Sequence, residues 1–234
     1  MKMAVEPEIE TQFNGLELLM AKAPFDEAKA AIEAPTPDGR KGSIATVQHV
    51  AEARISEHHD PRARNLGSAV AENLIYCPDG KIYITSKDYS PILKHASEAT
   101  EAHRQGNEFY ISKNELEEIV KVANEDIGKK AEERRVYILK KTDGYGIPVK
   151  DFAKDELVRF LFKDTAEKYA YFLQTESIVK KVYVSLPSPL EKPNKPFAWA
   201  LWFHGLNGRS ALLAGRNLNC SYGLRGVREV ASKS

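Results

Sequence analysis

Cysteine is scarce in this sequence, since Cys77 and Cys220 are the only two among 234 residues. Two cysteines so far apart do not form the disulfide framework of a small secreted domain. We expect two thiols in a reducing compartment, with a Cys77–Cys220 disulfide as the open alternative. No run approaches the roughly 20 apolar residues that span a bilayer. The start, MKMAVEPEIETQF, carries acidic residues and no apolar core, so we expect no secretory signal.

Neither sign of charge is in excess, because 34 basic residues face 33 acidic ones and the net charge is +1. This balance gives no reason to expect a membrane or nucleic-acid surface. The segment RRVYILKK (134–141) mixes aromatic and basic residues as single-strand binders do, but an ordinary strand with solvated ends explains it equally well. We expect no nucleic-acid partner, and the cytoplasm, a virion and unconventional display all stay open as locations.

Catalytic signatures are also missing. The sequence has no Walker A motif, no Rossmann glycine pattern and no paired C-x-x-C. GRSALLAG, around Ser210, lacks the G-x-S-x-G spacing of a nucleophile elbow. EHHD (57–60) gathers metal-capable side chains that point in different directions, and Glu101 and His103 are expected to face water. We therefore expect no enzyme, no cofactor and no metal.

The sequence predicts an α+β protein. Because 42% of its residues are hydrophobic, the chain can bury a core. Residues 1–60 are interpreted as a helical N-terminal lead, in which GLELLMAKAPFDEAKAAIEA has a helix-forming composition broken by Pro24, and 61–234 as one ligand-binding domain. Within that domain, strands and helices follow from period-two and period-3.6 patterns. Strands are predicted at 81–85, 136–141 and 180–186, and helices at 90–106, 112–125 and 164–175.

One segment departs from the rest of the chain. Residues 197–228, FAWALWFHGLNGRSALLAGRNLNCSYGLRGVR, contain no Asp, Glu, Lys, Gln or Met, and four arginines are their only charges. FAWALWFHG predicts a strand with Trp199 and Trp202 on opposite faces. Five glycines then indicate tight turns, and LRGVREV predicts a closing strand. Arginine suits partly buried positions because its planar fork satisfies several acceptors. A buried hairpin would have a similar composition.

The segments RSA (209–211) and GLRGVR (223–228) resemble the end of variable proteins of diversity-generating retroelements, particularly archaeal and viral ones. That family has a C-type-lectin-like fold of the formylglycine-generating-enzyme type. The resemblance implies that an error-prone reverse transcriptase replaces adenines in this part of the gene. Mutated AAC and AAT codons end in a pyrimidine, so they cannot encode Lys, Glu, Gln or Met. The missing residues of 197–228 fit this restriction.

The resemblance also implies that fixed and variable positions alternate. The fixed frame comprises Trp199, Trp202, Gly205, Gly208, Arg209, Ser210, Gly215, Arg225, Gly226, Val227 and Arg228. The predicted ligand-binding residues are His204, Leu206, Asn207, Ala211, Leu213, Ala214, Arg216, Asn217, Asn219, Ser221 and Tyr222. Their expected partner is a macromolecule, a protein or a cell-surface component. The calcium-dependent sugar motifs EPN and QPD are absent. The alternative is an enzyme or carbohydrate-binding module of the same broad fold.

Overall fold

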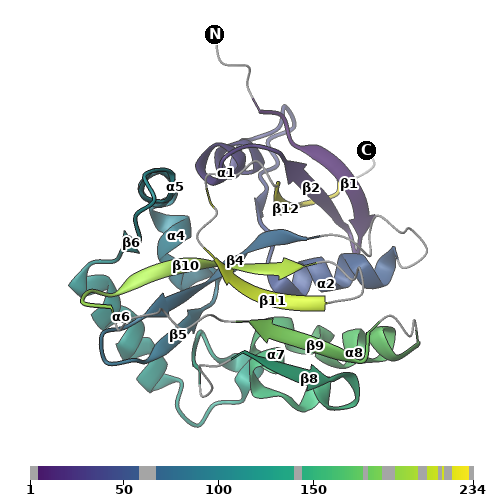
Figure 1. Cartoon of the computed structure of the whole chain (residues 1–234). Helices are drawn as coiled ribbons and strands as arrows, with labels where there is room; N and C mark the ends of the chain where they lie inside the picture. The colour runs from purple at the N-terminus through teal and green to yellow at the C-terminus, as the bar shows by residue number, and fades with distance from the viewer. Residues whose placement is uncertain are drawn as a thin grey trace.

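A computed structural model describes residues 5–57, 67–139, 144–175, 179–185, 193–204, 210–215, 218 and 223–231. Its strands are β1 (Glu8–Phe13), β2 (Leu16–Ala21), β3 (Ser43–Ile44), β4 (Ser68–Tyr76), β5 (Ile82–Thr85), β6 (Phe109–Tyr110), β7 (Val136–Ile138), β8 (Tyr145–Pro148), β9 (Lys181–Ser185), β10 (Phe197–His204), β11 (Ser210–Gly215) and β12 (Leu224–Glu229). They form one sheet in the order β1-β2-β12-β4-β10-β11-β9-β8 (Figure 1). Of the four remaining strands, β3 pairs with β12, β5 with β4 and β6 with β10, and β7 pairs with β5.

Helices cover both sides of this sheet (Figure 1). They are α1 (Phe25–Glu33), α2 (Val47–Ser56), α4 (Pro91–Lys94), α5 (Ala96–Arg104), α6 (Lys113–Glu125), α7 (Glu156–Phe162) and α8 (Ala166–Thr175). Residues of α2, α7 and α8 belong to one hydrophobic core, and residues of α1, α4, α5 and α6 belong to a second core. We call the two sides of the sheet the α8 side and the α1 side.

The N-terminal residues differ from the predicted helical lead. Residues 8–21 form the hairpin β1–β2, and the α-helices among the described residues 5–57 are Phe25–Glu33 and Val47–Ser56. LELLMA consists of good helix formers, but it is buried as a strand between β1 and β12. Packing on both faces of the sheet outweighs the weak intrinsic preference for helix. The segment 35–43 is a turn region that ends in β3, as expected.

The other predicted elements are largely confirmed. The strands at 82–85, 136–138 and 181–185 appear where alternation placed them. Helix α6 begins with the predicted capping box of Ser112 and Glu115, whose side chain and backbone groups bond reciprocally. The helix predicted over 90–106 is split into α4 and α5 at His95. His103 does not face water as predicted but is buried, one turn after Ala99 on the inner face of α5.

The last strand, β12, lies in the interior of the sheet. It pairs antiparallel with β2 over Leu224–Glu229 and parallel with β4 at Leu224. Arg225, 4% exposed, donates from Nε to Glu10 at 2.6 Å and from Nη2 to the same carboxylate at 2.9 Å. Its Nη1 also donates to the carbonyl of Gly67. This bidentate pair ties the C-terminal strand to the first strand, as the arginine-brace prediction anticipated.

Gly226 lies where β12 is packed most closely. A Cβ at this position would overlap Ile32 Cγ2 and lie 2.9 Å from the carbonyl oxygen of Ser43. Gly226 pairs with Leu19 on one side and with Ile44 on the other, so neither neighbouring strand has room to move away. Only glycine fits between α1 and β3 at this point.

Strand β4 is buried along its whole length, including the acidic residue Glu72. The Glu72 carboxylate accepts hydrogen bonds from the backbone N–H of Val47, at 3.2 and 3.3 Å, in the first turn of α2. Burial raises the pKa of Glu72 to about 7, and the bond from Val47 opposes part of this shift. The folded protein therefore holds a proton on Glu72 at a pH where the unfolded chain has released it.

We expect Glu72→Gln to change how stability depends on pH. A carboxyl with a raised pKa stabilises the fold below its unfolded pKa of 4.5, and this contribution is lost as the pH rises to about 7. Glutamine keeps an acceptor for Val47 and cannot ionise. The variant should match the parent at pH 4 and exceed its free energy of unfolding by about 3 kcal/mol above pH 7. Urea denaturation at both pH values measures this difference. Parallel pH curves for parent and variant would contradict it, and the exposed Glu6→Gln is the control.

Candidate functional site

The centre of the sheet is β10, whose side chains alternate between the two cores. Phe197, Trp199, Leu201 and Phe203 face the α8 side, while Ala198, Ala200 and Trp202 face the α1 side. The prediction that the two tryptophans lie on opposite faces is confirmed. On the α8 side, the Trp199 ring packs edge-on against Tyr76 with centroids 4.9 Å apart, and its Nε1 donates to Glu108. Trp202 on the other face has a different environment.

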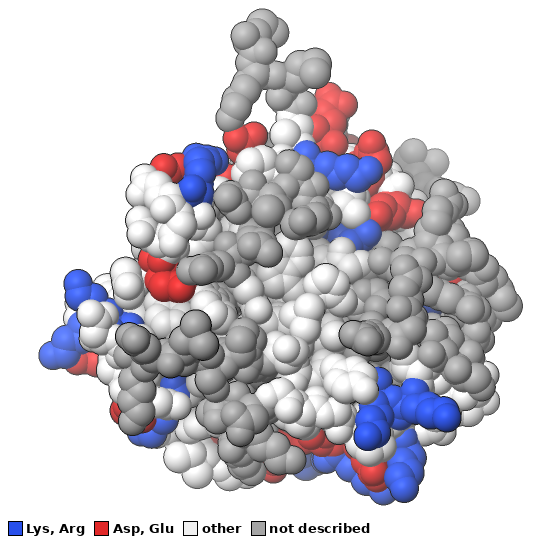
Figure 2. Space-filling view, viewed as in Figure 1, with Lys and Arg blue, Asp and Glu red and all other residues white. Residues whose placement is uncertain are grey.

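Beyond Trp202, no described helix packs on the α1 side of the sheet. The residues that share this side are Gly146, Pro148, Lys181, Tyr183, Ser185, Trp202, His204, Ala211, Leu213 and Gly215. We call this set the open face. Figure 1 shows β11, β9 and β8 in front of α7 and α8, with their other side turned toward the viewer. In the same view, charged side chains of the described residues lie toward the margin, and the described residues drawn at the centre are uncharged (Figure 2).

Register places the open-face residues in two rows across the strands. Trp202 pairs with Leu213, which pairs with Ser185, and His204 pairs with Ala211, which pairs with Tyr183. The first row continues through Ala69 of β4 to Leu224 of β12. Five strands therefore contribute to one continuous row on this side.

Two glycines form the flat floor of the open face. A Cβ on Gly215 would meet the Trp202 indole at 3.7 Å, and one on Gly146 would meet the Tyr183 ring at 3.6 Å. The two rings therefore lie over neighbouring backbone rather than standing upright from it. Tyr183 is 48% exposed, and the His204 ring lies 6.4 Å from the Trp202 ring. The face offers aromatic surface with polar edges, and Lys181 adds a positive charge at its β8 end.

Arg54 of α2 supports the open face from the α8 side. It is fully buried, and its Nη2 donates to the carbonyl of His204 at 2.9 Å and to that of Phe203 at 3.4 Å. Its Nη1 donates to the Tyr169 hydroxyl at 2.8 Å, and its guanidinium lies 3.8 Å from the centre of the Phe203 ring. Partial burial and the Arg54 charge lower the pKa of His204. His204 is thus a neutral imidazole at pH 7.

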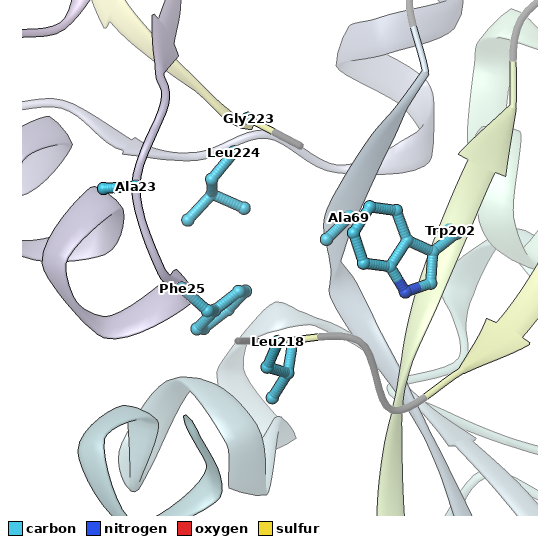
Figure 3. Close-up of a pocket in the computed structure, with 7 residues that line it drawn as sticks. All are labelled: Ala23, Phe25, Ala69, Trp202, Leu218, Gly223 and Leu224. Atoms are coloured by element: carbon cyan, nitrogen blue, oxygen red, sulfur yellow. The ribbon is translucent and has the colours of Figure 1, made fainter. Parts of the chain in front are cut away.

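An apolar hollow adjoins Trp202 (Figure 3). Figure 3 shows Trp202 and Ala69 on one wall, with Phe25, Leu218 and Leu224 opposite. The hollow measures about 10 Å³, which is the room of a single water molecule. It is therefore a shallow depression in the surface beside the open face and cannot enclose a small-molecule ligand.

The structure brings together only some of the predicted ligand-binding residues. His204, Ala211 and Leu213 lie on the open face, with Ala211 8% exposed. Ala214 is a correction: it lies on the α8 side, paired with Leu201, and packs against the core. Its position in an alternating strand puts it opposite to Leu213. The remaining predicted residues lie outside the described residues: Leu206, Asn207, Arg216, Asn217, Asn219, Ser221 and Tyr222.

Three contributors to this face were not among the predicted ligand-binding residues. Trp202 was assigned to the fixed frame, and Tyr183 and Gly146 come from a β8–β9 pair outside residues 197–228. Alternation in KKVYVSL separates Tyr183 from the buried Val182 and Val184, so its exposure was readable from the pattern. The strand that pairs with β9 was not readable, because β9 and β11 pair in parallel across the 24 residues 186–209.

The described ranges also bear on metal binding, thiol chemistry and membrane insertion. Among them there is no group of three His, Cys, Asp or Glu residues arranged to hold a metal ion. Cys77 is a buried free thiol, and burial raises its pKa to about 12. Its partner in the sequence, Cys220, lies outside the described residues. No helix in these ranges has the length and apolar character needed to cross a membrane.

Comparison with known proteins identifies the fold. No family model and no curated protein matches the chain. A solved structure described as "Accommodation of massive sequence variation in Nanoarchaeota by the C-type lectin fold" matches 96% of this chain and 100% of its own, with a TM-score of 0.59. Its sequence is 10% identical, so the likeness concerns the fold. The protein has a C-type lectin fold, with the mixed helices and strands expected of an α+β protein.

Proposed function

We propose that this protein binds a macromolecular ligand through the open face, without catalysis, and that a diversity-generating retroelement mutates the gene segment that encodes part of this face. The binding residues would be Trp202, His204, Ala211 and Leu213, together with the predicted residues in 205–209 and 216–222. These two segments connect β10 to β11 and β11 to β12 in the chain. The ligand is a protein or a cell-surface component.

One observation supports the diversification part most strongly. Burial accounts for the missing charges of β12 and of the covered side of β10. It does not account for the exposed position of His204 or the half-buried position of Leu213, which share the open face and carry neither Lys, Glu nor Gln. Strand β9 forms part of the same face but lies outside 197–228, and there an exposed Lys181 appears. At these exposed positions, the compositional change follows the sequence segment rather than the degree of burial.

The shape of the face supports a macromolecular ligand. The hollow beside Trp202 measures about 10 Å³, whereas pockets for small molecules hold about 300–1,000 Å³. A flat surface with aromatic anchors and small neighbouring residues is typical of protein-binding surfaces. Trp202 and Tyr183 would supply these anchors, and the small side chains around them would adapt to the partner.

A pair of alanine variants tests whether β11 tolerates change on one side only. Leu213→Ala, on the open face, should lower the free energy of unfolding by about 1 kcal/mol or less. Leu212→Ala, at 0% exposure on the α8 side, should lower it by about 3 kcal/mol, because it leaves a cavity in the core. Urea denaturation of both variants measures the contrast. Equal losses would mean that the face is covered and cannot serve as a variable surface.

The DNA that flanks the gene tests the diversification directly. A nearby near-copy of the sequence encoding 197–228, differing where the copy has adenine, would support the proposal and give the variable positions one by one. The differences should include the codons of His204, Ala211 and Leu213 and should spare those of Arg225 and Gly226. A locus with neither a repeat nor a reverse transcriptase gene would contradict diversification. Ligand binding by the open face would then be tested separately, with Trp202→Ala, once a partner is known.

A further inference from the structure

A second surface feature lies away from the open face, around the end of β12. It is a groove of about 330 Å³, lined by the start of β2, the turn before β3, the first turn of α2 and the end of β12. None of its lining residues belongs to the open face or to the hollow of Figure 3. A volume of this size is within the range of small-molecule sites. Its floor is apolar, formed by Leu16 and Val227.

Two arginines in the groove are held in place by one buried acid. Glu17, 5% exposed, accepts from Arg228 Nε at 2.8 Å and lies 2.7 Å from Arg228 Nη2. Arg40 approaches the same carboxylate at 3.4 Å, donates to Asp38 at 2.7 Å and donates to the carbonyl of Glu229 at 2.6 Å. Within the described chain, Arg228 Nη1 and Arg40 Nη2 have no acceptor. Both guanidinium groups are therefore oriented and still have donors to offer.

Two further donors line the groove. Lys41 is exposed and makes no ion pair or hydrogen bond to any described residue. His49 accepts the backbone N–H of Thr46 at Nδ1, at 3.2 Å, so the neutral ring carries its proton on Nε2. Burial lowers the pKa of His49 and keeps it in this neutral form at pH 7. The groove thus presents N–H donors from three chain segments.

The charged groups in and around the groove are equal in number, with Arg40, Lys41 and Arg228 against Glu17, Asp38 and Glu229. Glu17 and Asp38 neutralise the two arginines, which leaves the Lys41 ammonium as a positive charge without a partner in the described chain. The exposed carboxylate of Glu229 lies on the same lining and opposes an anion. Binding of an anion should therefore be modest, weakened by salt, and improved when Glu229 is neutralised.

We propose that this groove is a binding site for a small molecule that carries a phosphate group and an apolar body. Three side chains from two chain segments, Arg40 with Lys41 and Arg228, offer donors, which suits the three terminal oxygens of a phosphate better than the two of a carboxylate. The apolar floor of Leu16 and Val227 takes the remainder of the molecule. This site is independent of the open face, so its failure would leave the proposed function unaffected.

Phenyl phosphate, inorganic phosphate and benzyl alcohol are suitable probes, titrated into the whole chain by calorimetry and by amide NMR. We expect phenyl phosphate to bind one molecule per chain and to shift the amides of 40–43 and 227–229. It should bind more tightly than inorganic phosphate, and benzyl alcohol should not bind. The absence of saturable binding of phenyl phosphate up to about 10 mM would overturn the proposal. Equal affinity for phenyl phosphate and inorganic phosphate would overturn the claim that Leu16 and Val227 bind an apolar body.

Three variants locate the site. Lys41→Gln removes a charge that has no described partner, and it should weaken phenyl phosphate binding about fivefold without affecting the fold. Glu229→Gln should strengthen binding about twofold to threefold, because it removes an opposing charge. Lys121→Gln, an exposed change on α6, is the matched control and should bind as the parent does. Equal weakening in Lys41→Gln and Lys121→Gln would show diffuse surface attraction and contradict the proposal.

Discussion

Arg54→Met should lower the free energy of unfolding by about 3 kcal/mol. Methionine has a similar length, but it leaves the buried carbonyls of Phe203 and His204 without the donors that Arg54 supplies at 3.4 and 2.9 Å. The hydrogen bond to Tyr169 and the contact with the Phe203 ring are lost as well. Relief from burying the guanidinium charge offsets only part of this loss. Urea denaturation measures the change.

The same variant has a readout at the open face. Because the Arg54 charge helps to lower the pKa of His204, that pKa should rise toward its ordinary value in Arg54→Met. A ring-proton NMR titration follows it. Tyr169→Phe is the matched control: it removes one hydroxyl, should cost about 1 kcal/mol and should leave the His204 pKa where it is. An Arg54→Met protein as stable as the parent, with an unchanged His204 pKa, would contradict the supporting role of Arg54.

Gly226→Ala should also lower the free energy of unfolding by about 3 kcal/mol. The added methyl would overlap Ile32 of α1 and crowd the carbonyl of Ser43, and pairing on both sides prevents β12 from shifting. Gly215→Ala is the control within the same C-terminal segment, because its Cβ would meet Trp202 at an ordinary contact distance of 3.7 Å. That variant should stay within about 1 kcal/mol of the parent. Urea denaturation separates the two variants, and equal stability of Gly226→Ala and parent would contradict the close packing.

Local patterns predicted much of the fold. KIYIT and KKVYVSL alternate, and SKNELEEIVKVANE carries both a capping box and an apolar face, so each determines its own structure. LELLMA does not. Its residues favour a helix in isolation and form a strand because β12, some 200 residues later, pairs with it. A preference of tenths of a kcal/mol per residue is overcome by such long-range pairing.

The candidate site was predictable to a similar extent. A family resemblance predicted His204, Ala211 and Leu213 as ligand-binding residues, and all three lie on the open face. Ala214 was predicted with them but lies on the other side, because strand alternation turns it toward the core. Trp202 was predicted to belong to the fixed frame. The sequence does not reveal that no helix of the described residues packs on its side of β11 and β9. Tyr183 joins the face through a parallel pairing between β9 and β11. Register between distant strands is not encoded in either strand alone.

The position of β12 also constrains how the protein is made. Until residues 224–229 have been synthesised, β2 and β4 lack the strand that lies between them, and their unpaired edges are open to other chains. The contacts that complete the sheet join the two ends of the sequence, as in the pairing of Arg225 with Glu10. Folding therefore finishes late and depends on long-range contacts, which makes it slow. A chain that stops before β12 should aggregate, so a stop codon introduced within 197–223 would remove the protein altogether.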